Sequence, residues 1–147
     1  MFQHILVPTD GSPLSQDAVA RAVSFTKEAG ARITFFYAQP DTPAAYAGMG
    51  AISSPHLAQE LRERLDGAAR EILDAAEKVA GEAGLACTRV VLVGSKPYEL
   101  IIQAAEANGC DLIFMASHGR RGVSALLLGS ETTKVLTHSR IPVLVYR

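Results

Sequence analysis

The sequence predicts an α/β protein: a doubly wound, open sheet of five parallel strands with helices on both faces, in a Rossmann-like arrangement. Short apolar runs alternate along the chain with longer amphipathic stretches. The apolar runs are continuous instead of alternating with polar residues, which is typical of strands that helices bury on both faces. Right-handed crossovers between such strands narrow the arrangement to a doubly wound sheet.

The first strand and the first helix have the clearest signals. A short apolar strand over 5–7 ends at Pro8, and Ser12-Pro13 supplies the hydroxyl cap and first-turn proline of a helix that Gly30 closes. Apolar residues recur every three to four positions and form one side of this helix, at Leu14, Ala18, Val19, Ala22, Val23 and Phe25.

The remaining elements follow the same alternation. Strands are predicted over 33–38, 90–93, 112–116 and 141–146, and helices over 57–83, 97–107 and 130–137. The apolar stripe of the longest helix is predicted at Leu57, Leu61, Leu65, Ile72, Ala76 and Val79. The segment 39–56 fits neither pattern, because it is rich in Gly, Pro and Ala. It is either a surface connection or a lid that closes over a ligand with Tyr46 or Met49.

Length and composition exclude several classes of protein. The 147 residues suit one compact domain over 1–147, and a net charge of −1 argues against a nucleic-acid partner. No apolar run reaches the roughly 18 residues of a membrane span, so we expect a cytoplasmic protein without a membrane partner. Cys87 and Cys110 form no CxxC or His-Cys cluster, which disfavours a disulfide framework or a zinc site.

Polar residues follow the first predicted strand. The run Pro8-Thr9-Asp10-Gly11-Ser12 brings a carboxylate and two hydroxyls to a sharp turn in front of a helix. Ligands of open α/β sheets bind beyond the carboxyl ends of the strands, where the strand order reverses. We therefore expect Asp10 to accept hydrogen bonds from a base or a ribose. The alternative is that Asp10 and Ser12 only cap the helix, which stabilises it by about 1 kcal/mol.

A glycine-bearing segment follows the fourth predicted strand. Ala116-Ser117-His118-Gly119-Arg120-Arg121-Gly122 leads to Gly129-Ser130 at a helix start. Helix N-termini attract anions, and glycines let the backbone approach a phosphate closely. A phosphate site is therefore one interpretation, to which His118, Arg120 or Arg121 could contribute, and an ordinary connection is the other. The chain has no GxxxxGK[ST], no GxGxxG after the first strand and no GxSxG, which disfavours P-loop NTPases, dinucleotide dehydrogenases and α/β-hydrolases.

Three segments carry a resemblance to a known family. They are ILVPTDGS near the start, IPVLVYR at the end, and the segment 116–130, where nine residues separate Gly119 from Gly129-Ser130. In these segments the chain resembles the universal stress protein family. The pattern of its nucleotide-binding branch is Gly, two residues, Gly, nine residues, then Gly and Ser or Thr. The chain matches this pattern except at its first position, which is Ala116.

The resemblance implies a strand order of 3-2-1-4-5 and a site for ATP or a related adenine nucleotide. The residues implied for the adenine side are Pro8, Thr9, Asp10 and Ala38; those for the ribose and phosphates are Met115, Ala116, His118, Gly119 and Arg120; those for the phosphate tail are Gly129, Ser130 and Glu131. Mg²⁺ can bridge the phosphates, because few lysines lie nearby to balance their charge. The resemblance assigns no metal ligands.

The last predicted strand, which begins at Ile141 and ends at Tyr146, is apolar on both faces. In the implied order it is an edge strand, and a two-fold homodimer through this strand is the expected partner arrangement. The implied function is a homodimeric, nucleotide-binding stress-response protein. Alternatives are an interaction module in which Ala116 has closed the nucleotide site, or a slow ATP hydrolase. Enzyme activity would be weak at most, because only Asp10 and His118 offer a general base.

Overall fold

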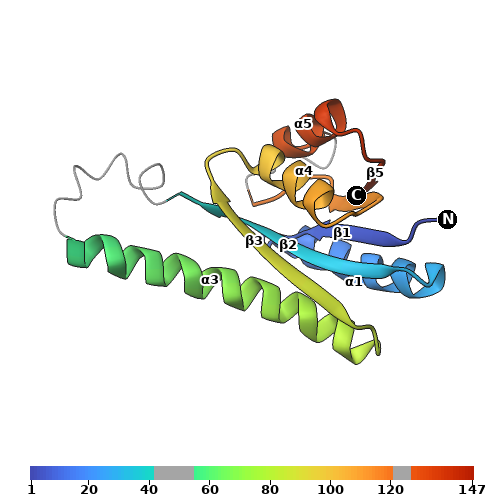
Figure 1. The fold of residues 1–147 in the computed structure, drawn as a ribbon, viewed down its shortest axis with the longest axis horizontal. Helices are drawn as coiled ribbons and strands as arrows, with labels where there is room; N and C mark the ends of the chain where they lie inside the picture. The colour runs from blue at the N-terminus through green and yellow to red at the C-terminus, as the bar shows by residue number, and fades with distance from the viewer. Residues whose placement is uncertain (42–54, 121–126) are drawn as a thin grey trace.

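The structure, a computed structural model, describes residues 1–41, 55–120 and 127–147. It contains a five-stranded parallel sheet in the order β3-β2-β1-β4-β5, which confirms the predicted fold class and strand order (Figure 1). The strands are β1 His4–Pro8, β2 Arg32–Pro40, β3 Cys87–Gly94, β4 Leu112–Ala116 and β5 Val143–Tyr146. The helices are α1 Pro13–Ala29, α3 Pro55–Glu82, α4 Pro97–Ala107 and α5 Ser130–His138.

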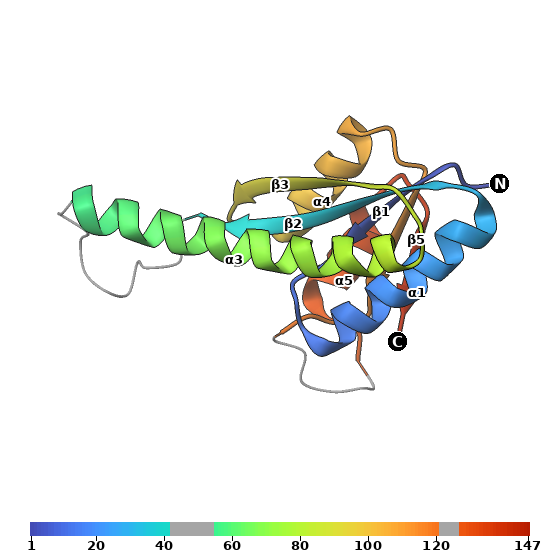
Figure 2. The same cartoon turned by 90° about the horizontal axis from the view of Figure 1, so that it is seen from below.

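The helices cover both faces of the sheet. α4 and α5 lie on one side and α1 and α3 on the other, as the two ribbon views show (Figures 1 and 2). Neighbouring strand residues enter opposite cores: Val7 and Phe35 pack toward α1 and α3, while Leu6 and Phe36 pack toward α4 and α5. All four side chains are fully buried. This two-sided burial explains why the strands read as continuous apolar runs.

The buried face of α3 differs from the predicted stripe. Its buried residues are Ala69, Leu73, Ala76 and Ala80, of which Ala76 was predicted. Among the other predicted residues, Val79 packs against the core, Leu61, Leu65 and Ile72 are half-buried, and Leu57 is exposed, so the stripe is confirmed in part. Both ribbon views show the N-terminal half of α3 extending past the ends of β2 and β3, so the sheet cannot cover its early leucines (Figures 1 and 2). In the half that does pack on the sheet, alanines allow close approach, and small side chains are a weak signal in an apolar pattern.

Two strands are longer than their apolar runs. β2 continues through Gln39 to Pro40, and β3 begins at Cys87 and includes Thr88 and Arg89. These polar residues extend the ladder because the backbone pairing does not depend on the side chain. Arg89, on the outermost strand, forms ion pairs with Asp74 and Glu77 of α3. The Asp74 and Glu77 hydrogen bonds raise the pKa of the Arg89 guanidinium.

The predicted strand over 141–146 begins later than expected, at Val143. Tyr46, Met49 and Arg121 lie outside the described residues, so the lid and a phosphate contact from Arg121 stay predictions. Within the described ranges, no helix combines the length and the apolar character needed to cross a membrane.

Candidate functional site

The strand order reverses between β1 and β4, and the two predicted site segments meet there. β1 pairs with β2 on one side and β4 on the other, while the chain leaves β1 through α1 and leaves β4 toward α5. Ligands of doubly wound sheets bind at such a point, beyond the carboxyl ends of the strands. The site is therefore built from the turn after β1 and from the segment after β4.

The turn after β1 is held by hydrogen bonds to β2 and α1. The Thr9 N–H donates to the Phe36 carbonyl at 2.9 Å, which continues the β1–β2 pairing past Pro8. The Thr9 and Ser15 hydroxyls are 2.6 Å apart, and the Asp10 N–H donates to Ser15 Oγ at 3.1 Å. Ser12 caps α1 by accepting from the Ser15 N–H at 3.3 Å, which confirms its predicted capping role.

Asp10 links this turn to the segment after β4. Its Oδ1 accepts from the Ser12 N–H and its Oδ2 from the Arg120 N–H, each at 2.9 Å. A Cβ added to Gly119 would lie 2.3 Å from Asp10 Oδ2, so only glycine allows this approach. Asp10 therefore holds the two predicted site segments together, whatever else it contacts.

Hydrogen bonds hold the two ends of the segment after β4 together and to β5. The Ser117 N–H donates to the Tyr146 carbonyl at 2.7 Å, and the Gly129 N–H donates to the Ser117 carbonyl at 2.8 Å. The Thr132 hydroxyl donates to the carbonyl of buried Ala116 at 3.0 Å. A Cβ on Gly129 would approach His118 Cα to 3.0 Å, so this glycine also has a packing role.

The N-terminus of α5 follows the segment after β4 and has no side-chain cap from its N-cap residue. Gly129 is its N-cap residue, and no side chain of the described residues caps this end. The first intrahelical bond runs from the Thr133 N–H to the Gly129 carbonyl at 3.0 Å. The N–H groups of Ser130, Glu131 and Thr132 precede it and have no acceptor within the helix. This end can therefore donate to an anion.

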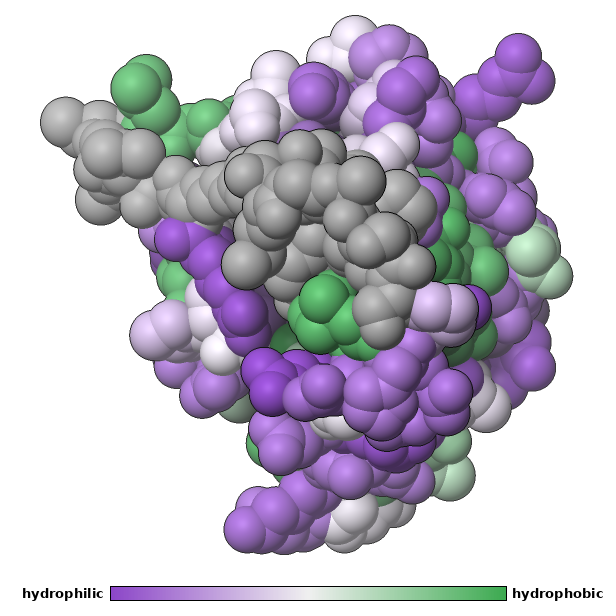
Figure 3. All heavy atoms as spheres, turned by 90° about the vertical axis from the view of Figure 1, so that its left-hand side faces the viewer, coloured by the Kyte–Doolittle hydropathy of each residue, from purple (hydrophilic) through white to green (hydrophobic). Residues whose placement is uncertain are grey.

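An open hollow of about 480 Å³ lies between the two segments. It is lined by Gly11, Ser12, Pro13, Leu14, His118, Gly119 and Arg120. His118 is half-buried, with Nδ1 3.2 Å from the Ser117 hydroxyl, and Arg120 is exposed. Figure 3 looks at the molecule from the side toward which β2 and β3 run, where hydrophilic side chains make up most of the described surface.

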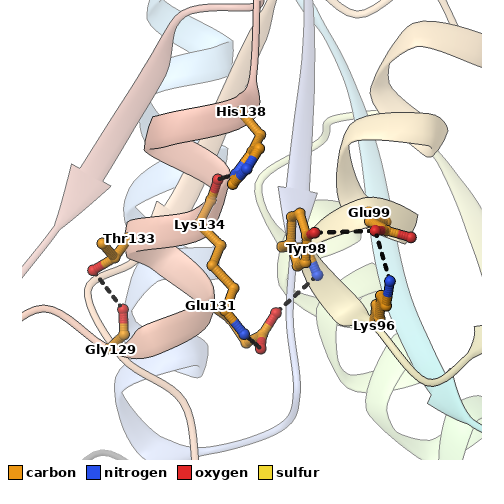
Figure 4. A network of polar contacts seen from close by, with 8 residues as sticks. All are labelled: Lys96, Tyr98, Glu99, Gly129, Glu131, Thr133, Lys134 and His138. Carbon is orange, nitrogen blue, oxygen red and sulfur yellow. Dashed lines mark hydrogen bonds and ion pairs between the residues drawn. The ribbon is translucent and has the colours of Figure 1, made fainter.

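The other predicted residues do not line this hollow. Met115 and Ala116 are buried at the end of β4, and Ala38 is half-buried near the end of β2, paired with Leu92 of β3. The Glu131 carboxylate bonds to the Tyr98 N–H of α4 at 2.9 Å (Figure 4). Within the described residues, no three His, Cys, Asp or Glu side chains are grouped to hold a metal ion.

Tyr37 belongs to the same neighbourhood and was missed in the sequence. Burial raises the pKa of its hydroxyl, the Arg120 charge lowers it and the Asp10 charge raises it again, so the ring lies within electrostatic reach of both. The available signal was its position one residue before Ala38 at a strand end, but an aromatic residue in a strand is more often part of the core.

The sheet order, the helices on both faces and the meeting of two turns at the reversal of strand order define a doubly wound α/β protein. The universal stress protein family model matches residues 1–147, and the chain belongs to this family.

Several curated relatives match the whole chain, among them one from Methanocaldococcus jannaschii and one from Thermus aquaticus. It is 33% identical over 147 residues to universal stress protein MJ0531 of Methanocaldococcus jannaschii, covering 83% of that protein. It is 34% identical over 151 residues to a universal stress protein of Thermus aquaticus, covering all of it.

Solved structures share the fold. That of hypothetical protein MJ0577 matches with a TM-score of 0.81 and 27% identity, over 99% of this chain and 95% of that one. A universal stress protein in complex with cAMP matches with a TM-score of 0.68 and 24% identity, over 99% and 97% of the two chains. One from Archaeoglobus fulgidus in complex with dAMP matches with a TM-score of 0.71 and 18% identity, over 99% and 98%. The last two show a shared fold alone.

Proposed function

We propose that this universal stress protein binds ATP or a related adenine nucleotide as a regulatory, stress-response protein. The uncapped N-terminus of α5 is the observation that carries the proposal, because Gly129-Ser130 stands there at the family spacing from Gly119. Its first-turn N–H groups suit the phosphates of a nucleotide. Universal stress proteins of the same fold have been solved with cAMP and with dAMP, both adenine nucleotides.

The proposed base side is the turn after β1. Pro8, Thr9 and Ala38 would border the adenine, and the Asp10 carboxylate would accept from its amino group. Both Asp10 oxygens already accept a backbone N–H, and a carboxylate oxygen has lone pairs for a further donor.

The proposed ribose and phosphate side is the segment after β4. Met115, Ala116 and Gly119 would border the ribose and the first phosphates, with His118 and Arg120 as positive or donating groups. Gly129, Ser130 and the backbone of Glu131 would meet the phosphate tail. Mg²⁺ would arrive bound to the phosphates themselves, because no cluster of metal-binding side chains exists among the described residues.

Titration calorimetry tests the proposal. With protein at about 100 μM, binding of ATP with Mg²⁺ should give measurable heat, because even a weak site is occupied at that concentration. GTP is the matched control, since guanine presents a carbonyl where adenine presents the amino group that Asp10 would accept. If neither nucleotide gives heat, the proposal is overturned. If ATP and GTP bind equally well, the role of Asp10 is overturned.

A second candidate function is a nucleotide-free interaction module of the same family. Ala116 favours it, because its methyl stands where the family pattern has glycine and the residue is buried at the end of β4. The Ala116→Gly variant separates the two candidates. If the methyl closes the site, the natural chain binds no ATP and the variant does.

We also propose that two copies pair through β5. The Ile113 N–H donates to the Pro142 carbonyl and the Ser117 N–H to the Tyr146 carbonyl, so even-numbered residues of this strand bond to β4. Val143 and Val145 therefore direct their backbone N–H and carbonyl groups to the free edge. An apolar strand with a free edge is suited to pairing with a second copy of itself.

A further inference from the structure

The N-terminus of α4 takes its cap from another helix. Pro97 has no N–H, and the Glu99 and Leu100 N–H groups both donate to the Lys96 carbonyl, at 3.1 and 3.3 Å. The Lys96 side chain provides no cap. The Tyr98 N–H is the one remaining first-turn donor, and it bonds to Glu131 Oε2 at 2.9 Å. Glu131 thus completes the hydrogen bonding of α4 from the first turn of α5.

Further contacts join the same two helices around Tyr98. Lys134 Nζ lies 3.5 Å from Glu131 Oε1 and 5.5 Å from the centre of the Tyr98 ring. The Tyr98 and His138 rings are 5.1 Å apart. Figure 4 shows the Glu131 carboxylate pointing from α5 toward the backbone of Tyr98, away from Gly129.

The direction of this carboxylate matters for the phosphate end of the proposed site. Glu131 follows Ser130 directly, so its negative charge stands within one turn of the α5 N–H groups. A free carboxylate there would repel phosphate and compete for those donors. Bonded to the Tyr98 N–H and beside Lys134, it is held toward α4 instead and its charge is partly balanced.

We propose that Glu131 is a positioning residue for nucleotide binding: by capping α4 it orients the first turn of α5 and keeps its own charge away from the phosphates. This inference rests on the proposed function. It differs from a direct contact between Glu131 and the phosphate tail or its metal ion, in which the carboxylate would have to leave Tyr98.

Three variants test the inference by calorimetry with ATP·Mg²⁺ and with adenosine, which lacks phosphates. Glu131→Gln keeps a carbonyl oxygen that can accept from Tyr98, and Glu131→Ala removes it. Glu99→Ala is the matched control, because it deletes a carboxylate of the same network that accepts from the Tyr98 hydroxyl and from Lys96 but does not bridge the helices. Amide exchange of Tyr98, followed by NMR, reports on the cap without any nucleotide.

Glu131→Ala should weaken ATP binding by about three- to tenfold, the range expected for the net loss of one ordinary hydrogen bond, and leave adenosine binding unchanged. It should also speed exchange of the Tyr98 amide, while Glu131→Gln and Glu99→Ala stay close to the natural chain in both measurements. Tighter ATP binding by both Glu131 variants overturns the inference, because it means that the carboxylate faces the phosphates. Unchanged Tyr98 exchange in Glu131→Ala overturns the cap alone, whereas absence of ATP binding by the natural chain overturns the proposed function and the inference with it.

Discussion

At the scale of single residues, the two glycines of the family spacing have neighbours within the protein itself. Asp10 Oδ2 lies 2.3 Å from where a Cβ on Gly119 would stand, and His118 Cα lies 3.0 Å from where a Cβ on Gly129 would stand. The sequence interpretation assigned such glycines to the approach of a phosphate. The geometry adds a second cause, which is that the two turns of the site pack directly on each other.

Gly119→Ala should therefore destabilise the protein even without a ligand. We expect a loss of about 1–3 kcal/mol in urea unfolding, typical of an overpacked site. The loss should shrink in an Asp10→Ala background, because that change removes the atom that the new methyl meets. Gly81→Ala is the control: no atom lies within 4 Å of the added Cβ, so the helix α3 should gain about 0.5–1 kcal/mol. Equal effects of the two glycine variants would contradict the packing argument.

His4 predicts a pH dependence of folding. Burial lowers the pKa of its ring and the Arg32 charge lowers it further, against smaller raising effects from the Asn108 backbone and Asp111. Its Nε2 lies 2.7 Å from Thr34 Oγ1, while Nδ1 is buried without a hydrogen-bond partner among the described residues. The folded chain therefore favours the neutral ring more than the unfolded chain does.

Because the unfolded chain binds the proton more readily, the contribution of His4 is complete above its ordinary pKa of 6.5 and is lost as the pH falls below it. The free energy of unfolding should decline between about pH 7 and pH 5.5, and this decline should be smaller in His4→Gln. His56→Gln, at an exposed position in α3, should keep the full decline. A profile that is identical in all three chains would remove His4 as the cause.

At the scale of elements, the sequence predicted the order of strands and helices better than the residues at which each of them begins and ends. α4 and β4 have their predicted ends, since Pro97, Asn108 and a continuous apolar run mark them. The ends of β2 and β3 were missed because polar residues continue the backbone ladder there. The buried face of α3 was predicted only in part, because a sequence pattern does not say how far a helix extends beyond its sheet.

The meeting of the two turns of the candidate site was predictable to a similar degree. The two turns were found from their place after β1 and β4, since topology alone brings those strand ends together. The partners of their polar groups were not predictable. The bond from Glu131 to Tyr98 joins residues 33 positions apart and depends on how α4 and α5 pack.

The tie between α5 and β4 gives a prediction at this scale. Buried Thr132 donates to the Ala116 carbonyl, so Thr132→Val should leave that buried acceptor unsatisfied and cost about 1–3 kcal/mol of unfolding free energy. Thr133→Val is the matched control, because the exposed Thr133 hydroxyl bonds only within its own helix, to the Gly129 carbonyl. Thermal or urea unfolding distinguishes them, and equal losses would show that the contact between α5 and β4 adds nothing.

At the scale of the whole molecule, the proposed pairing through β5 sets the mass in solution. Light scattering should give twice the chain mass of 15.6 kDa at micromolar concentration. Val145→Pro should shift the mass toward one chain, because it removes an N–H on the free edge while leaving the bonds to β4 in place. Unfolding of the variant by urea controls for damage to the monomer, and a natural chain of single mass would rule out the pairing.

The ion pairs of Arg89 affect how the edge strand β3, at the other side of the sheet from β5, can contact a further strand. β3 is the other outermost strand, and a charged side chain anchored to α3 hinders a further strand from adding there. β5 carries no charge over Val143–Tyr146, and a two-fold pair would occupy that edge in both copies. In the proposed pair one edge would be used and the other is guarded, so assembly by strand addition would close at two chains and would not propagate into a filament.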